Sequence, residues 1–143
     1  MSLQKILDKL LKKEGDEAMP QSYHIAGFDL ECLKSIEHSP RKKSLQYFVD
    51  EWKKRGNLYS LDEEEPIAVA DLGGIYCVYN GNQRVLFYLL NGFNSVEAIG
   101  FTPTEFYWDI LNGTLRLAEN MGILSFNDLA TMVERPESYR VKY

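Results

Sequence analysis

The chain has 143 residues, the length of one folded domain, and a chain of this size buries about two thirds of its unfolded surface. Its net charge of -5 and its isoelectric point near 5.1 provide no overall basic field, which disfavours tight binding to duplex nucleic acid. No apolar run is long enough for a bilayer span or a secretory signal, and Cys32 and Cys77 form no C-x-x-C motif. We therefore expect a single cytoplasmic domain, residues 1–143, with no membrane partner.

The first part of the chain predicts an amphipathic helix followed by irregular structure. Apolar residues recur there at the spacing of one helix face, with lysines between them: Leu3, Ile6, Leu7, Leu10 and Leu11. Gly15 and Pro20 end this pattern, and residues 19–36 show no clear period, apart from a short helix expected from Asp29. Residues 1–38 are therefore expected to form an N-terminal helical extension, which packs on its own domain or docks onto a partner.

A second helix is predicted from Ser39 to Gly56. Ser39 is a good N-cap, Pro40 suits the first helical position, and Gly56 supplies the stop. Basic residues gather around this helix at positions 41–43 and 53–55. They form either a solvated face with cations placed favourably at the helix end, or a basic face that binds a partner.

Few residues of the chain suit catalysis or metal binding. The acidic run Asp62–Glu65 is expected in a solvated loop over residues 57–65, because it lacks the ligand spacing of a calcium loop. His24 and His38 are the only histidines, too few for a typical structural zinc site and poorly placed for a serine-type triad. Both are expected at the surface or as caps, and we predict no metal site from them.

The centre of the chain predicts strands packed around a buried helix. β-branched, aromatic and other apolar residues indicate strands at 67–70, 75–79 and 96–101, and a helix at 85–90 that Gly92 ends. The first two strands are expected to form a hairpin over Gly73 and Gly74, and the helix then connects to the third strand by a right-handed crossover.

The corner between the second strand and the helix is the one candidate site. Gly81 allows close approach of a ligand, the helix N-terminus offers free N–H groups, and Arg84 adds a guanidinium fork. Such a corner suits a phosphate or a carboxylate. The competing interpretation is structural, in which Gly81 makes a tight turn and Arg84 caps or pairs locally. A structural Arg84 would be buried against a carboxylate or carbonyl groups.

Two further helices are predicted in residues 102–143. Thr102 is expected to cap the first, with Pro103 at the first helical position and Glu105 closing a capping box, and Gly122 ends it. Ser125 and Asp128 are expected to open the second in the same way. Together with the central strands, these helices predict an α+β fold, a compact mixed sheet surrounded by helices.

The order of these central motifs resembles the ParB/sulfiredoxin superfamily. The resemblance covers about residues 39–101 and depends on the sequence P-I-A-V from Pro66, the turn D-L-G-G from Asp71, the corner N-G-N-Q-R from Asn80, and the N-G pair after the helix. It implies a ParB/sulfiredoxin-like core over 39–101. It also implies that Gly81, Asn82, Gln83 and Arg84 bind a nucleotide or phosphate, since the Gly and Arg of this corner typically hold a nucleotide phosphate in that superfamily.

The chain departs from the superfamily pattern at the corner. Asn82 occupies the place of the reactive cysteine of sulfiredoxins and cannot form a sulfur-linked phosphoryl intermediate. The Glu or His that partition proteins place beside the arginine is also missing, because Gln83 stands there. Neither sulfiredoxin chemistry nor a partition clamp with its metal-bound nucleotide is therefore expected.

Two functions are compatible with the sequence. In the first, the protein binds a small phosphate-containing ligand and transfers a phosphoryl group or hydrolyses a nucleotide, with Glu97 or Asp109 on a magnesium ion. The candidate cofactor is then a nucleotide with Mg. In the alternative, the protein is a non-catalytic module that binds a protein or nucleic-acid partner through the N-terminal helix or the basic face of residues 41–55.

Overall fold

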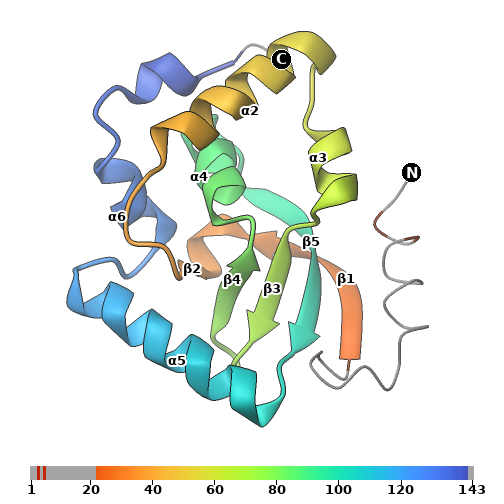
Figure 1. The fold of residues 1–143 in the computed structure, drawn as a ribbon, viewed down its shortest axis with the longest axis vertical. Helices are drawn as coiled ribbons and strands as arrows, with labels where there is room; N and C mark the ends of the chain where they lie inside the picture. The colour runs from red at the N-terminus through yellow and green to blue at the C-terminus, as the bar shows by residue number, and fades with distance from the viewer. Residues whose placement is uncertain (1–2, 4, 6–21, 142–143) are drawn as a thin grey trace.

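The structure, a computed structural model, describes Leu3, Lys5 and residues 22–141. Within these ranges a five-stranded mixed sheet is combined with five α-helices and two short 3-10 helices, which confirms the α+β class (Figure 1). Leu3 and Lys5 are helical, and the rest of the predicted N-terminal helix lies outside the described residues. No helix in the described part of the chain is long and apolar enough to cross a membrane.

The sheet has the strand order β1-β5-β3-β4-β2. Its strands are β1 (Ser22–Asp29), β2 (Leu33–Ser35), β3 (Ala68–Asp71), β4 (Tyr76–Asn80) and β5 (Ser95–Thr102). The predicted hairpin is confirmed, because β3 and β4 pair antiparallel across a turn in which Gly73 and Gly74 both have positive φ. β5 lies parallel to β3 on the other side of the hairpin, after an intervening helix.

The two outer strands correct the expectation for residues 1–38. Residues 22–35 are not part of a helical extension: β1 pairs antiparallel with β5 over its whole length, and β2 pairs parallel with β4. The short helix expected from Asp29 is present as the 3-10 helix η1 (Leu30–Cys32), whose first turn is capped by the Asp29 carboxylate. This three-residue helix joins the two strands that form opposite edges of the sheet.

The helices are α2 (Lys42–Arg55), α3 (Tyr59–Glu64), α4 (Asn82–Leu90), α5 (Glu105–Asn120) and α6 (Phe126–Thr131), followed by the 3-10 helix η2 (Pro136–Tyr139). The predicted stops are confirmed for three of them, since Gly56, Gly92 and Gly122 all adopt positive φ just after a helix. The capping box of α6 is also confirmed, because the Ser125 and Asp128 side chains each bond the backbone of the other residue.

Three of the helices differ from the sequence predictions, two of them in where they start and one in being a helix at all. Neither Ser39 nor Pro40 opens α2, which begins two residues later after an extended Arg41. Thr102 still belongs to β5, so α5 is preceded by Thr104 and has no side-chain cap, and Glu105 closes no capping box. The acidic run is not a loop, because residues 59–64 form α3.

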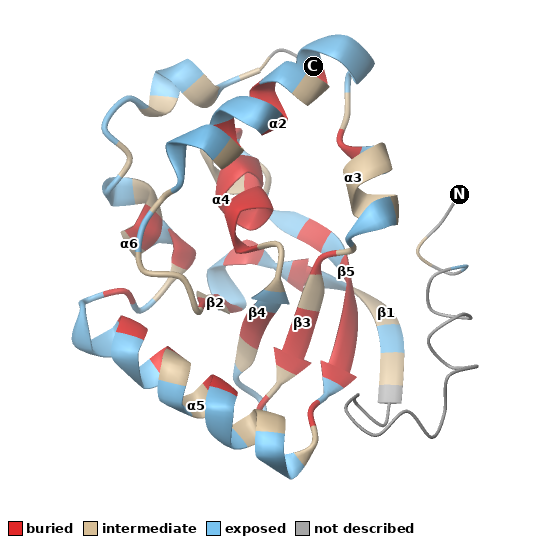
Figure 2. Ribbon diagram, viewed as in Figure 1, coloured by how far each residue is buried: buried red, intermediate tan, exposed pale blue. Residues whose placement is uncertain are grey.

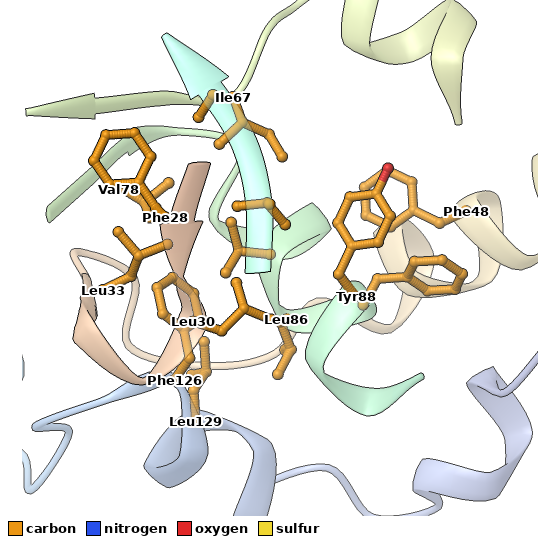
Figure 3. Packing of buried hydrophobic residues seen from close by; sticks show 14 of the residues in the cluster. Phe28, Leu30, Leu33, Phe48, Ile67, Val78, Leu86, Tyr88, Phe126 and Leu129 are labelled. Atoms are coloured by element: carbon orange, nitrogen blue, oxygen red, sulfur yellow. The ribbon is translucent and has the colours of Figure 1, made fainter. Parts of the chain in front are cut away.

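The sheet separates two cores. Val69 and Val78 belong to the larger core, which α2, α4 and α6 cover, while Ala70 and Cys77 belong to the smaller one under α5. Figure 2 shows α4 at the centre, where residues 82–88 are all buried. In the close-up of Figure 3, Leu86 of α4 lies between the sheet residues and the side chains of α6.

Shortening a buried α4 side chain should destabilise the protein strongly. Leu86 is fully buried, so Leu86→Ala should lower the free energy of unfolding by about 2 to 5 kcal/mol through the cavity it leaves. Leu89 is only half-buried, so Leu89→Ala should cost less, and truncation of the exposed Met132 should change stability by about 0.5 kcal/mol or less. Urea denaturation measures all three. Equal losses in the free energy of unfolding on shortening Leu86 and Met132 would contradict the central position of α4.

The two cysteines should differ sharply in reactivity. Both are free thiols, Cys32 exposed and Cys77 buried in the small core, where desolvation raises the pKa of Cys77 to about 11. Ellman's reagent should therefore label one thiol per native chain at neutral pH and two after denaturation. Rapid labelling of two thiols in native protein, or of one in Cys32→Ser, would show that Cys77 is accessible.

Candidate functional site

Gly81 forms the corner at which β4 passes into α4. It has a φ of 94°, a left-handed conformation that side chains rarely adopt, and it lies at the N-terminus of the helix. A Cβ atom there would lie 3.0 Å from Ile67 Cγ1 and 3.2 Å from Arg84 Nη2. The glycine is thus required by the backbone and also by the guanidinium group that packs against it.

Arg84 points into the protein. Its side chain is only 5% exposed, and Nη1 donates to Asp62 Oδ1 of α3 at 2.8 Å. Nη2 donates to the main-chain carbonyl of Glu65, just after α3. The guanidinium is therefore buried against a carboxylate and a carbonyl, the arrangement expected of an arginine with a structural role, and it does not face an open cleft.

Asp62 links Arg84 to Tyr88, one helical turn further along α4. The Tyr88 hydroxyl donates to Asp62 Oδ2 at 3.2 Å. Burial raises the pKa of Asp62, while the positive charge of Arg84 and the two hydrogen bonds oppose that rise. Burial and then the Asp62 charge raise the pKa of Tyr88, which keeps this hydroxyl protonated and able to donate.

Asn82 and Gln83 bind the connection between β2 and α2. Asn82 Oδ1 accepts from Ser35 Oγ and from the main-chain N–H of Ile36, both at 3.2 Å, while its Nδ2 donates to the Val78 carbonyl. Gln83 Oε1 accepts from the Arg41 N–H at 2.8 Å. Both amides are buried, so their hydrogen bonds hold this connection against the corner.

Gln83 also explains why α2 starts late. Its Nε2 donates to the Ser39 carbonyl at 3.1 Å, and its Oε1 accepts from the Arg41 N–H, so residues 39–41 are bound to α4 and Arg41 is held in extended form. The four predicted site residues are therefore brought together at one corner, but the side chains of Asn82, Gln83 and Arg84 bond to other parts of the chain.

The structure does not assemble a metal centre from the predicted carboxylates. No group of three or more His, Cys, Asp or Glu side chains within the described ranges is placed to hold a metal ion, so Glu97 and Asp109 belong to no such group. His24 is exposed on the edge strand β1, opposite Gly100. His38 is half-buried, and its Nε2 is buried without a hydrogen-bond partner.

The predicted basic face on α2 is partly neutralised within the chain. Arg41 pairs with Glu37, Lys42 with Glu134, and Arg55 with Glu51. The basic side chain of each pair is exposed, so the pairs contribute little to stability, about 0 to 1 kcal/mol each, but they reduce the positive charge that this surface offers to a partner.

A pocket of about 590 Å³ lies beside the corner and was not predicted from the sequence. Its walls are largely apolar and aromatic: Leu3, Trp52, Leu58, Tyr59, Ile67, Tyr88, Phe93 and Val96. Three carboxylates also line it, those of Asp62, Glu63 and Glu97, and the described lining contains no lysine, arginine or histidine. Such a pocket favours a ligand with an apolar body and a positive charge, and disfavours a polyanion such as a nucleotide.

One local signal could have suggested the pocket. Leu61 directly precedes the acidic run and follows Leu58 by three positions, and apolar residues at such spacing indicate a helix with one face turned inward. Asn57 Oδ1 accepts from the Tyr59 N–H at 3.0 Å and caps this helix from one residue further back than usual. The helix brings Asp62 to Arg84 on one side and to the pocket on the other.

Comparisons of the chain with protein-family models, with curated protein sequences and with solved structures gave no match. The fold and the site therefore define only an α+β protein with an internally bonded strand-to-helix corner and an acidic, aromatic pocket next to it.

A conservative change at Arg84 should destabilise the ligand-free protein. Lysine cannot donate from two nitrogens to Asp62 and to the Glu65 carbonyl at once, so Arg84→Lys should lower the free energy of unfolding by about 1 kcal/mol or more. The matched control is Arg55→Lys, since the Arg55 side chain is exposed where it pairs with Glu51, and its replacement should change stability by about 0.5 kcal/mol or less. Thermal and urea denaturation measure both, and an unchanged Arg84→Lys protein would refute the structural role.

Proposed function

We propose that this protein is a non-catalytic interaction module on a divergent ParB/sulfiredoxin-like fold, and that its pocket binds a polypeptide segment carrying a lysine or arginine among apolar residues. The corner that resembles the superfamily's phosphate site then stabilises the fold, and the pocket next to it carries the function.

The fold assignment is supported by the order of the central elements. P-I-A-V leads into β3, the D-L-G-G turn joins β3 to β4, and the Gly81 corner begins α4. β5 then returns parallel to β3. This order and the position of Gly81 and Arg84 agree with what the resemblance implies.

The pocket is the observation that carries the functional proposal. A lysine or arginine side chain has an apolar stem that packs on aliphatic and aromatic walls and a charged end that needs a carboxylate. Asp62 and Glu97 supply carboxylates at the lining, and Trp52, Tyr88 and Phe93 supply aromatic surface. Because Asp62 is already held by Arg84, the exposed Glu97 is the residue whose charge a partner would use most directly.

The phosphate-site hypothesis has less support from the geometry. Its central residue, Arg84, would have to leave Asp62 and the Glu65 carbonyl to reach a phosphate, and the partly buried Asp62 would then lose its counterion. The same hypothesis predicts a nucleotide-dependent rise in thermal stability, about 2.7 kcal/mol at one hundred times the dissociation constant.

Selection of peptides from a random display library on the full chain tests the proposal. Enriched sequences should carry lysine or arginine beside leucine, isoleucine or an aromatic residue. The affinity of a synthetic enriched peptide should fall at least about tenfold in Glu97→Lys, because the new cation repels the peptide. It should stay unchanged in Glu119→Lys, an equal charge reversal on the exposed side of α5.

Two results would refute the proposal that the pocket binds a basic, apolar peptide segment. Enrichment of acidic peptides would contradict the charge argument, and equal loss of affinity in both variants would place the binding surface elsewhere. A panel of nucleotides with magnesium, measured by thermal shift, serves as the parallel test. A shift that disappears in Arg84→Lys would favour the phosphate site instead.

A further inference from the structure

The outward side of α5 carries an apolar stripe that the fold does not use. The inner residues Leu111 and Leu115 pack in the small core. On the opposite side lie Phe106, Ile110, Leu117 and Met121, which are 47% to 63% exposed. Leu124, just after the helix, continues the stripe and is also exposed. Figure 2 shows this side of α5 at the surface, along the lower left edge of the molecule.

The stripe follows a single helix face. Residues 106, 110, 113 and 117 are separated by four, three and four positions, which is the spacing at which residues on one side of a helix meet a neighbouring helix. A face of this kind on a water-exposed helix is typical of a contact with another helix.

Gly113 lies at the middle of the stripe, in the interior of α5. A glycine inside a helix is less favourable than alanine, and a Cβ atom at this position would meet nothing within 4 Å. The protein's own packing therefore does not require a glycine here. A small residue is required where two helix backbones approach closely, which is what a partner helix crossing at Gly113 would need.

The charges beside the stripe are self-complementary. Asp109 and Arg116 lie two helical turns apart on the same flank of α5, both exposed, and neither makes an ion pair or side-chain hydrogen bond within the described part of the chain. When two such helices cross antiparallel about a two-fold axis near Gly113, each flank meets the same flank of its partner. Asp109 of each chain then lies near Arg116 of the other.

We propose that α5 is the interface of a homodimer, in which two copies pack their α5 helices antiparallel across Gly113 and exchange two Asp109–Arg116 ion pairs. The contact is isologous, so it closes at two chains. With 16 residues, α5 is about 24 Å long, and the buried area is at the small end of specific interfaces. The dimer is therefore weak and dissociates in the micromolar range or above.

Sedimentation velocity of the full chain from micromolar to millimolar concentration tests the proposal. The wild-type protein should show a reversible monomer–dimer equilibrium. Asp109→Arg places like charges together twice and should raise the dissociation constant at least about tenfold. The double variant Asp109→Arg with Arg116→Asp restores both pairs and should dimerise like the wild type. Glu119→Arg, on the same helix but away from the stripe, should leave the equilibrium unchanged.

The variant Gly113→Ala tests whether the two α5 backbones approach closely at this position. It should weaken the dimer while raising the melting temperature of the dilute monomer, because alanine favours the helix. The proposal would be overturned if the wild type stayed monomeric at every concentration or if Asp109→Arg left the dissociation constant unchanged. It would also be overturned if the double variant did not regain wild-type dimerisation or if Gly113→Ala did not weaken the dimer. The pocket variant Glu97→Lys should dimerise normally, so peptide binding and dimerisation can fail independently.

Discussion

The ion pair between the buried Arg84 and the partly buried Asp62 is the constraint on which the centre of this protein depends. An arginine cannot be neutralised inside a protein, and a buried charge without a partner is strongly destabilising. Three parts of the chain satisfy the guanidinium: α3 provides the carboxylate, the chain after α3 provides a carbonyl, and Gly81 leaves room for the group itself. The ion pair therefore fixes α3 to α4, together with the packing of Leu58 and Leu61 in the larger core.

The same pair connects the corner to the pocket. Asp62 contacts Arg84 with one oxygen and Tyr88 with the other, and both Asp62 and Tyr88 line the cavity. A change at Arg84 therefore alters the wall of the pocket as well as the stability of the fold. In experiments, loss of binding in an Arg84 variant needs to be compared with its loss of stability before either is assigned to direct contact.

The sequence predicts the elements whose signals are local. The hairpin over Gly73 and Gly74, the burial of α4 and the capping box at Ser125 each depend on a few neighbouring residues, and all three are confirmed. β1 and β2 were missed because their partners lie in β5 and β4, far along the chain, and their own residues show no clear period. Strand formation there is decided by pairing, which single-sequence patterns do not contain.

The candidate site shows a different kind of limit. A Gly-x-x-Arg corner has the same residues whether the guanidinium binds a phosphate or a carbonyl and a carboxylate of its own chain. The deciding partner, Asp62, lies 22 positions before Arg84, in a run of acids that is typical of a solvated loop. Only the three-dimensional placement of α3 distinguishes the two roles. The dimer interface proposed for α5 was likewise not predicted, because the roles of Asp109, Arg116 and Gly113 follow only from knowing which side of α5 is exposed.

The short helix η1 has a consequence for the shape of the sheet and for how it folds. In a flat five-stranded sheet the outer strands would be about 19 Å apart, yet the four peptide units from Asp29 to Leu33 span at most about 15 Å. The sheet must therefore curl so that its two edge strands, β1 and β2, approach each other. Residues 68–102 contain the three inner strands and α4 in one continuous stretch, which can assemble from near-neighbour contacts. β1 and β2 add to the two edges of this unit. Because the short η1 joins them, neither strand can pair with the sheet without bringing the other close to the opposite edge.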